Sequence, residues 1–408
     1  MASGSTELFL VLAGLIFAGI ISLLIFKRFK ITDVLILMVL GVILGQGLHL
    51  VDAKYVEPYM AAIGSFTLAM VLFNEGLNLS YNELKELGPK VLTFSLVVYA
   101  LTVALIGLIV YFIDPLHNLF QSLVIAIVLG APGPAVVLPV LHGLTLNDKL
   151  KKFLVMEVII TDAIAILLVT AFLVLGIKDI SEFTPEVVSR MINTAALSIF
   201  VGIVAGVLWV GILSYYREKF DYLLALGTML LTYSIAAFLN SNGILAVFTL
   251  GLFIGNVKAV KLNELRLVHE EFTFLIKTFF FIYLGSLFNY SYLNISLILT
   301  AIAIIAPMLI ARYAAVFIFR TGDAVSRPVT TLVIARGVAV AIMAILVSNA
   351  KLINFPYFLE ITFIVIFITN LIATIGAYIY EKRVGYAQQI HVGATQLKPI
   401  ESGKNTGL

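Results

Sequence analysis

Residues 130–162 read GAPGPAVVLPVLHGLTLNDKLKKFLVMEVIITD, and the features in this stretch decide the fold. Pro132, Gly133 and Pro134 fall in the middle of an apolar run, where proline removes a backbone donor and interrupts a helix. Asp162 lies about ten residues into the next apolar run. A broken helix beside an aspartate, with both inside apolar segments, predicts an ion site made of freed carbonyls and one carboxylate.

The composition of the whole chain points to a membrane. Of 408 residues, 61% are hydrophobic and 12% are charged, and the mean hydropathy is +1.09. A soluble protein has about a quarter of its residues charged, so a soluble globular enzyme is excluded. The chain has no cysteine, no basic tract for nucleic acid, and no motif for a cofactor or an enzymatic active site. We expect an all-α polytopic protein in a lipid bilayer.

Apolar runs long enough for membrane helices recur along the chain, since a span needs about 20 apolar residues. Thirteen such runs lie between breaks made of Gly, Pro or charged residues. Their cores are 8–26, 31–49, 58–78, 91–113, 118–144, 153–175, 191–214, 222–239, 243–257, 272–290, 293–319, 328–350 and 357–380.

Lys and Arg are unevenly divided between alternate loops. One set of loops and the C-terminal tail hold 19 of the 26, the other set holds 4, and 3 lie inside spans. The positive-inside rule then places the N-terminus outside and the C-terminus in the cytoplasm, in the cell membrane. We expect residues 1–384 to form the transmembrane domain and residues 385–408 a short polar cytoplasmic tail that is disordered.

Asp162 is the most informative of the ionisable residues inside the spans. It is too deep to reach water by snorkelling, so it must pair, bind a cation or take a proton. Thr161 beside it offers a further oxygen to a monovalent cation. The alternative is a permanent ion pair with Arg312 or Arg336.

Glu157 precedes Asp162 on the same predicted helix, about 140° around its axis, so the two carboxylates need not share a site. Glu157 with Arg312 or Arg336 makes a buried structural ion pair, and the residues leave the partner open. Glu75 is a candidate for ion or proton binding, with a snorkelling or capping role as its alternative. Lys277 is expected to snorkel.

A weak repeat links two predicted helices. Residues 160–165 read ITDAIA and residues 368–373 read ITNLIA, which places Asn370 where the first copy has Asp162. Each copy follows a helix marked by Gly or Pro, and the two run in opposite directions through the membrane. This pattern is typical of an inverted-topology repeat, with chance similarity as the alternative.

Six segments in order resemble the monovalent cation:proton antiporter superfamily, in its NhaP and Na+/H+ exchanger branch. They are FNEGLNL at 73–79, GAPGPAVVLPVL at 130–141, EVIITD at 157–162, FFFIYLGSLF at 279–288, LIARYAAVF at 309–317 and ARGVAVAI at 335–342. The resemblance implies thirteen helices in inverted repeats, a core domain and a dimerisation domain, and a homodimer. It also implies that helices 5 and 12 are broken and cross at the ion site.

The same resemblance assigns roles to single residues. Asp162 takes the position of the exchanging carboxylate, with Thr161 in place of its asparagine neighbour. Glu157 is paired with Arg312, and Arg336 lies by the crossing.

Three positions depart from the family pattern. The family's Thr-Asp in helix 5 is Pro132-Gly133, its serine after the glutamate is Val158, and its acid in the first motif is Asn74, with Glu75 one place later. Several of the family's cation ligands are therefore absent from this chain.

These observations predict an antiporter that exchanges Na+ or Li+ for H+, with proton and cation competing for Asp162. Exchange of K+ or of another solute for protons is the first alternative. A non-transporting membrane sensor with the same fold is the second.

Overall fold

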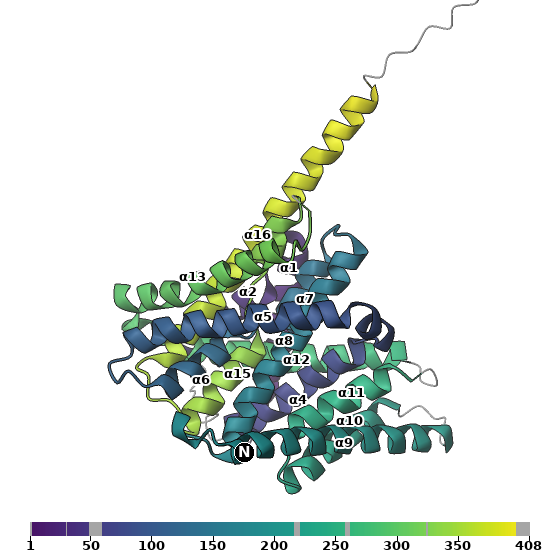
Figure 1. Cartoon of the computed structure of the whole chain (residues 1–408), viewed down its shortest axis with the longest axis vertical. Coiled ribbons are helices and arrows are strands. Elements are labelled where there is room, and N and C mark those ends of the chain that lie inside the picture. Colours follow the sequence, from purple (N-terminus) through teal and green to yellow (C-terminus); the bar gives the residue numbers. More distant parts are fainter. Residues whose placement is uncertain are drawn as a thin grey trace, which may run out of the picture.

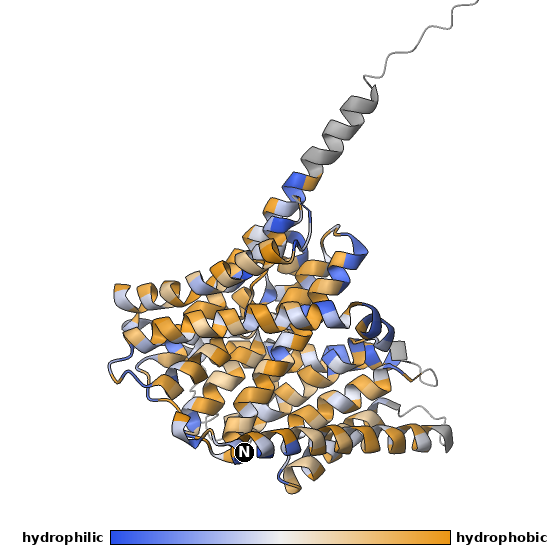
Figure 2. Cartoon of the chain, viewed as in Figure 1, coloured by the Kyte–Doolittle hydropathy of each residue, from blue (hydrophilic) through white to orange (hydrophobic). Residues whose placement is uncertain are grey.

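The structure is a computed structural model that describes residues 2–29, 31–48, 59–215, 221–257, 262–323 and 325–396. Every regular element in these ranges is helical, and the helices pack into one bundle (Figure 1). Helices satisfy their own backbone hydrogen bonds, as a bilayer requires of a spanning segment. Most of the ribbon is apolar, and polar residues gather at helix ends and in loops (Figure 2). The predicted all-α membrane architecture is confirmed.

The helices coincide with all thirteen predicted runs, two of which are each divided into two half-helices. Among the described residues, seven helical spans are long and apolar enough to cross a membrane, and four further apolar helices are shorter. The helices are α1 (Ala2–Phe29), α2 (Asp33–Val42), α4 (Met60–Asn78), α5 (Tyr81–Ile113), α6 (Leu119–Gly130), α7 (Pro134–His142), α8 (Asp148–Leu175), α9 (Pro185–Tyr215), α10 (Asp221–Phe238), α11 (Gly243–Gly255), α12 (Leu262–Leu287), α13 (Ile295–Ile318), α14 (Arg327–Leu332), α15 (Val338–Asn349) and α16 (Phe358–Gln396).

The helices divide into two groups with little contact between them. The core group contains α5, α6, α7, α8, α13, α14, α15 and α16, and the scaffold group contains α1, α2, α4, α9, α10, α11 and α12. The broadest contact across the boundary joins α4 to α15, where a Cβ placed on Gly64 would lie 2.9 Å from Ile342 Cγ2. Smaller contacts across the boundary join α2 to α16, α12 to α15, and α8 to α9 and α11.

Close helix packing holds α4 within the scaffold group. A Cβ on Gly255 of α11 would lie 2.5 Å from the Leu77 carbonyl oxygen, and one on Gly251 would overlap the Phe73 carbonyl. Gly76 of α4 makes a similarly close contact with the backbone of α11. Small residues allow two backbones to approach this closely in a membrane. Glu75, which precedes Gly76, is thereby fixed to the scaffold.

Two helices of the core group are interrupted. Residues 131–133 separate α6 from α7, and residues 333–337 separate α14 from α15. Pro134 occupies the first turn of α7, where its missing N–H leaves no hydrogen bond unmade. Before α14, the Ser326 hydroxyl and N–H donate to Asp323 Oδ1 at 2.5 and 2.8 Å, which holds the pKa of that carboxyl below its ordinary value. The predicted breaks in the fifth and twelfth helices are confirmed.

The last helix is longer than expected. α16 continues to Gln396 and projects beyond the bundle (Figure 1). The disorder expected from residue 385 therefore does not hold through residue 396. The segment EKRVGYAQQ at 381–389 consists largely of good helix formers, so the spanning helix continues into it. Residues 397–408 of the predicted tail lie outside the described residues.

Candidate functional site

The two interruptions cross one another inside the core group. The Gly133 N–H donates to the Ala335 carbonyl oxygen at 2.9 Å. A Cβ on Gly133 would lie 2.5 Å from the Gly337 Cα, so only a residue without a side chain fits at this point. The crossing brings four helix ends together away from water. Their free backbone groups need partners there.

Arg336 supplies partners to both interruptions. Its Nε donates to the Leu129 carbonyl at 2.8 Å, and its Nη1 donates to the Ile334 carbonyl at 3.0 Å. The Leu129 carbonyl lies at the C-terminal end of α6, where a helix carries partial negative charge, and the Ile334 carbonyl lies in the interruption after α14. Arg336 therefore lies in the crossing, and it forms an ion pair with no described carboxylate.

Glu157 and Arg312 form a buried ion pair. Arg312 Nη1 and Nη2 donate to Glu157 Oε1 and Oε2 at 3.0 and 2.9 Å, and neither side chain is more than 6% exposed. Arg312 Nε also donates to the Thr330 carbonyl at 2.8 Å. The pair joins α8, α13 and α14. Of the two arginines that the residues alone left open, Arg312 is the partner of Glu157.

Asp162 has no such partner. It is 0% exposed, and neither of its carboxylate oxygens accepts a hydrogen bond from any described residue. Arg312 is engaged by Glu157, and Arg336 is engaged by backbone carbonyls. A permanent ion pair between Asp162 and either arginine is therefore absent from this structure. A buried carboxylate without a partner is costly, so its presence requires an explanation.

Thr161 has a different environment from its neighbour. Its hydroxyl donates to the Glu157 carbonyl at 2.7 Å, which leaves the oxygen free to accept. The side chain lines a cavity of about 20 Å³ together with Tyr99 and Arg336. A cavity of this size holds about one water molecule.

The related segment on α16 is hydrogen-bonded to the crossing. Asn370 Nδ2 donates to the Arg336 carbonyl at 2.9 Å, which ties α16 to the crossing. Thr369 donates to the carbonyl four residues earlier, as Thr161 does on α8. The Asn370 Oδ1 has no described partner. Equivalent positions of the weak repeat thus hold a structural amide on α16 and an unpaired carboxylate on α8.

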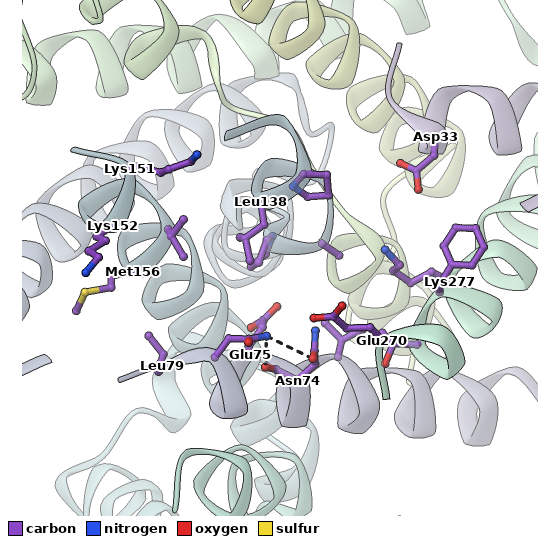
Figure 3. Close-up of a pocket in the computed structure, with 18 of the residues that line it drawn as sticks. Asp33, Asn74, Glu75, Leu79, Leu138, Lys151, Lys152, Met156, Glu270 and Lys277 are labelled. Atoms are coloured by element: carbon purple, nitrogen blue, oxygen red, sulfur yellow. Dashed lines mark hydrogen bonds between the residues drawn. The ribbon is translucent and has the colours of Figure 1, made fainter. Parts of the chain in front are cut away.

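A cavity of about 610 Å³ opens beside the crossing, between the two groups of helices. Figure 3 shows Glu75 and Asn74 along its α4 edge, with Lys151 and Lys152 of α8 across from them. Glu75 is 4% exposed, and neither of its carboxylate oxygens has a described partner. Glu75 therefore neither caps a helix nor snorkels to the surface.

Three further polar side chains belong to this region. Lys277, which was expected to snorkel, lines the large cavity. Glu270 lines it too. This residue was not predicted, because it precedes the apolar run of its helix, which begins at residue 272. Tyr99 was also missed. Its hydroxyl donates to the Ile127 carbonyl at 2.9 Å, and the signal was a tyrosine within an apolar run, which needs such a partner.

Comparison with known proteins agrees with this geometry. The family model for the transmembrane part of sodium/hydrogen exchangers matches residues 12–379. The K(+)/H(+) antiporter NhaP2 of Shewanella sp. (strain MR-4) is 26% identical over 357 residues, which cover 85% of this chain and 61% of that protein. A probable Na(+)/H(+) antiporter 2 of Methanocaldococcus jannaschii is 24% identical over 298 residues, which cover 68% of this chain and 69% of that protein. The chain thus spans about three fifths of the length of the Shewanella relative.

The solved structure of the sodium proton antiporter MjNhaP1 from Methanocaldococcus jannaschii at pH 8 has the same fold. The TM-score is 0.72 at 19% sequence identity, and the match covers 93% of this chain and 98% of that one. The sequence resemblance to the antiporter superfamily is confirmed, because the family model extends over most of the chain. The chain belongs to the sodium/hydrogen exchanger family.

Proposed function

We propose that the chain exchanges a monovalent cation for a proton across the membrane by alternating access. Asp162 binds one proton or one cation, never both. The core group carries the loaded site from the large cavity to the opposite face, while the scaffold group stays fixed in the bilayer. One observation carries the proposal, namely that the fully buried Asp162 carboxylate has no described partner.

The chemistry follows from the cost of burying a charge. An ionised carboxylate away from water needs a positive charge or a proton. Arg312 is paired with Glu157, and Arg336 donates to backbone carbonyls and not to Asp162, so the species that binds the Asp162 oxygens must come from solution. A cation and a proton that compete for one group couple two opposing flows, because only the neutralised site crosses the bundle at low cost.

The proposed cation is Na+ or Li+. Oxygen is the donor atom that such hard cations prefer, and Asp162, Thr161, Glu75 and Asn370 are the side chains that offer it. K+ is the alternative, supported by the name of the Shewanella relative, a K(+)/H(+) antiporter, and by the absence of Thr-Asp ligands at Pro132-Gly133. Exchange measured separately with Na+, Li+, K+ and Rb+ distinguishes these cations.

The decisive experiment is a substitution at Asp162. The purified protein is reconstituted into liposomes, and proton movement driven by a cation gradient is followed with an internal pH dye. Asp162→Asn keeps the size of the side chain and removes its charge, so we expect saturable exchange to fall to the level of empty liposomes. Asp148→Asn makes the same change in the exposed first turn of α8 and should retain exchange. Retained saturable exchange in Asp162→Asn removes Asp162 from the mechanism.

One exchanging carboxylate implies exchange of one cation for one proton without net charge movement. A potential-sensitive dye in the same liposomes should therefore show no membrane potential that builds up with exchange. A potential that grows with the cation gradient and disappears in Asp162→Asn would contradict the account based on one carboxylate.

The placement of the protein is part of the same proposal. The chain lies in the cell membrane as a homodimer, with its N-terminus outside and its C-terminus in the cytoplasm. The large cavity then faces the cytoplasm, because Lys151 and Lys152 at its edge lie at the end of α8 that the positive-inside rule assigns to that side. Cation-dependent thermal stabilisation without any flux would favour the membrane sensor instead.

A further inference from the structure

A buried asparagine joins the two groups of helices at the start of α11. Asn242 is 4% exposed and caps that helix, with its Oδ1 accepting from the N–H groups of Ile244 and Leu245 at 3.1 and 3.2 Å. Its own N–H donates to Ser198 Oγ of α9 at 2.8 Å. Because α9 and α11 both belong to the scaffold group, these bonds fix the orientation of the Asn242 side chain within the scaffold.

The amide nitrogen of the same side chain reaches the core group. Asn242 Nδ2 donates to Thr170 Oγ1 of α8. The Thr170 hydroxyl itself donates to the Ile166 carbonyl at 2.6 Å, which leaves its oxygen free to accept. Thr170 is 6% exposed, so both partners are shielded from water. Separating them without a replacement would leave a buried donor unpaired, and this makes the bond energetically significant.

This hydrogen bond lies at the end of the boundary that is remote from the large cavity. Residues 148–156 of α8 include its cavity lining, and Thr170 lies about 20 Å further along the helix axis. Helix α4 lines the cavity with its last turns, and α11 runs beside it in the same direction, so the start of α11 lies at the remote end as well. The boundary is thus open at the cavity and closed at the other end, where Gly64 also meets Ile342.

The two partners move apart in any transition that opens the remote end. Thr170 is on α8, the helix that carries Asp162, and α8 packs more extensively with α5, α6 and α7 than with α9 or α11. Asn242 is bonded to the scaffold. A core movement that closes the cavity and opens the opposite face therefore draws Thr170 away from Asn242.

We propose that Asn242 is a positioning residue that holds the core group, and Asp162 with it, in the state that faces the large cavity. Its bond to Thr170 stabilises this state and is absent from the opposite one. The bond shifts the populations of the two states and does not block the movement between them. Asn242 thereby sets the fraction of molecules that present the ion site to each face. This inference rests on the proposed exchange by alternating access.

The test measures the KM for Na+ from each face separately, with K+ as a second probe. Right-side-out and everted membrane vesicles present opposite faces of the full chain. Their orientation is checked with an impermeant maleimide on Ser181→Cys in the turn after α8, since the chain has no cysteine of its own and Ser181 is exposed. Measurements are made at alkaline pH, where protons compete least for the site.

Thr170→Val keeps the shape of the side chain and removes the acceptor. The KM on the face opposite the cavity should fall about fivefold, because the state that binds from that face gains population by the factor that one net hydrogen bond contributes. The KM on the cavity face should change by less than about twofold, since most molecules still face the cavity. Thr170→Ser retains the hydroxyl and should keep both wild-type values.

Two further variants show whether this one bond is responsible. Asn242→Ser keeps a capping oxygen at the start of α11 and removes the amide donor, so it should lower the same KM to the same extent. Combining it with Thr170→Val should lower the KM no further, because both changes remove one interaction. Thr362→Val is the matched control, since Thr362 is 0% exposed and its hydroxyl donates to the Phe358 carbonyl of its own helix at 2.8 Å.

An unchanged KM on both faces in Thr170→Val and Asn242→Ser would overturn the proposal, because the bond would then have no weight in the choice of state. Equal changes on the two faces would overturn it as well, since they indicate a general loss of packing. A fall in Thr362→Val as large as that in Thr170→Val would also refute it. In each case exchange itself persists, whereas retained exchange in Asp162→Asn is what defeats the proposed function.

Discussion

Glu157 and Asp162 lie on the same helix and are both almost fully buried, yet they have opposite surroundings. The rotation between them turns Glu157 toward the guanidinium of Arg312. Asp162 faces away from it and meets no donor. A carboxylate that is satisfied by the protein holds helices in register, and one that is not remains available to solution. The difference in partners therefore separates the acid that joins helices from the acid that we propose to exchange.

We expect Glu157→Gln to destabilise the protein, because it leaves the Arg312 guanidinium buried without a counter-charge. Breaking such a pair costs about 3–5 kcal/mol. Thermal unfolding of the protein in detergent measures the loss. Glu186→Gln, the same change at an exposed acid on α9, should leave stability unchanged. Normal stability with abolished transport would show instead that Glu157 binds the ion.

At this scale the sequence predicted which residues matter better than what they contact. Asp162 and Glu157 were recognisable because a charge inside an apolar run is costly. The choice between Arg312 and Arg336 required coordinates, since both arginines lie on helices distant in sequence from Glu157. Glu75 was recognisable as an acid in a span. Its position in the lining of the large cavity depends on how α4 packs, which local sequence does not determine.

The two interrupted helices depend on each other for backbone hydrogen bonds. Each leaves carbonyls and N–H groups without intrahelical partners, and the crossing joins them through the bond from Gly133 to Ala335. Arg336 then donates a hydrogen bond to a carbonyl of each interrupted helix, Leu129 in the first and Ile334 in the second. The broken elements are stable in the bundle because their backbone groups are satisfied there by one another and by a single guanidinium.

Gly133→Ala should disturb the crossing, since the new Cβ would lie 2.5 Å from the Gly337 Cα and neither backbone can move freely. Overpacking of this kind costs about 1–3 kcal/mol. We expect a lower melting temperature and weaker exchange in liposomes. Gly227→Ala is the control, because no atom lies within 4 Å of its added Cβ. Equal melting temperatures for Gly133→Ala and wild type would show that the crossing is looser than the contact implies.

The two breaks differ in how visible they are in the sequence. Pro132 and Pro134 predict the first break, because proline inside an apolar run interrupts a helix. The second contains no proline between residues 333 and 337, and Gly337 alone is a weak signal. It was expected from the family resemblance and not from local chemistry. Tertiary contacts with α6 and α16 hold it open.

The whole molecule consists of two helical groups joined by a narrow boundary. Contacts within each group are extensive, and those between the groups are fewer and are broadest where α4 meets α15. A boundary of this kind permits one group to slide or rock against the other without unpacking either. The large cavity lies along it and takes its lining from both sides.

A cross-link over this boundary should stop transport. Gly64→Cys with Ile342→Cys places two thiols at the contact between α4 and α15, in a chain with no other cysteine. We expect oxidation to abolish exchange in liposomes and a reducing agent to restore it, while each single variant stays active under both conditions. Cation-dependent thermal stabilisation should survive oxidation. Full exchange by a completely cross-linked protein would show that this boundary does not move.

The overall architecture was more predictable than its division into groups. The number of helices followed from apolar runs of membrane length, and the alternation of Lys and Arg was consistent with that number. The grouping was not predictable from composition, because it depends on which apolar faces meet. The extension of α16 to Gln396 was missed because its polar composition was taken to indicate disorder.

In the proposed exchange, the buried Asp162 carboxylate itself restrains the leakage of ions. A carrier with an empty, ionised site would have to move an uncompensated carboxylate through the water-free centre of the bundle. This desolvation costs several kcal/mol even after the surroundings relax. A carrier neutralised by its cargo avoids that penalty. Unproductive movement of the empty carrier between the two faces is thereby suppressed without a separate locking element. The ion gradients across the membrane then dissipate less when either substrate is scarce.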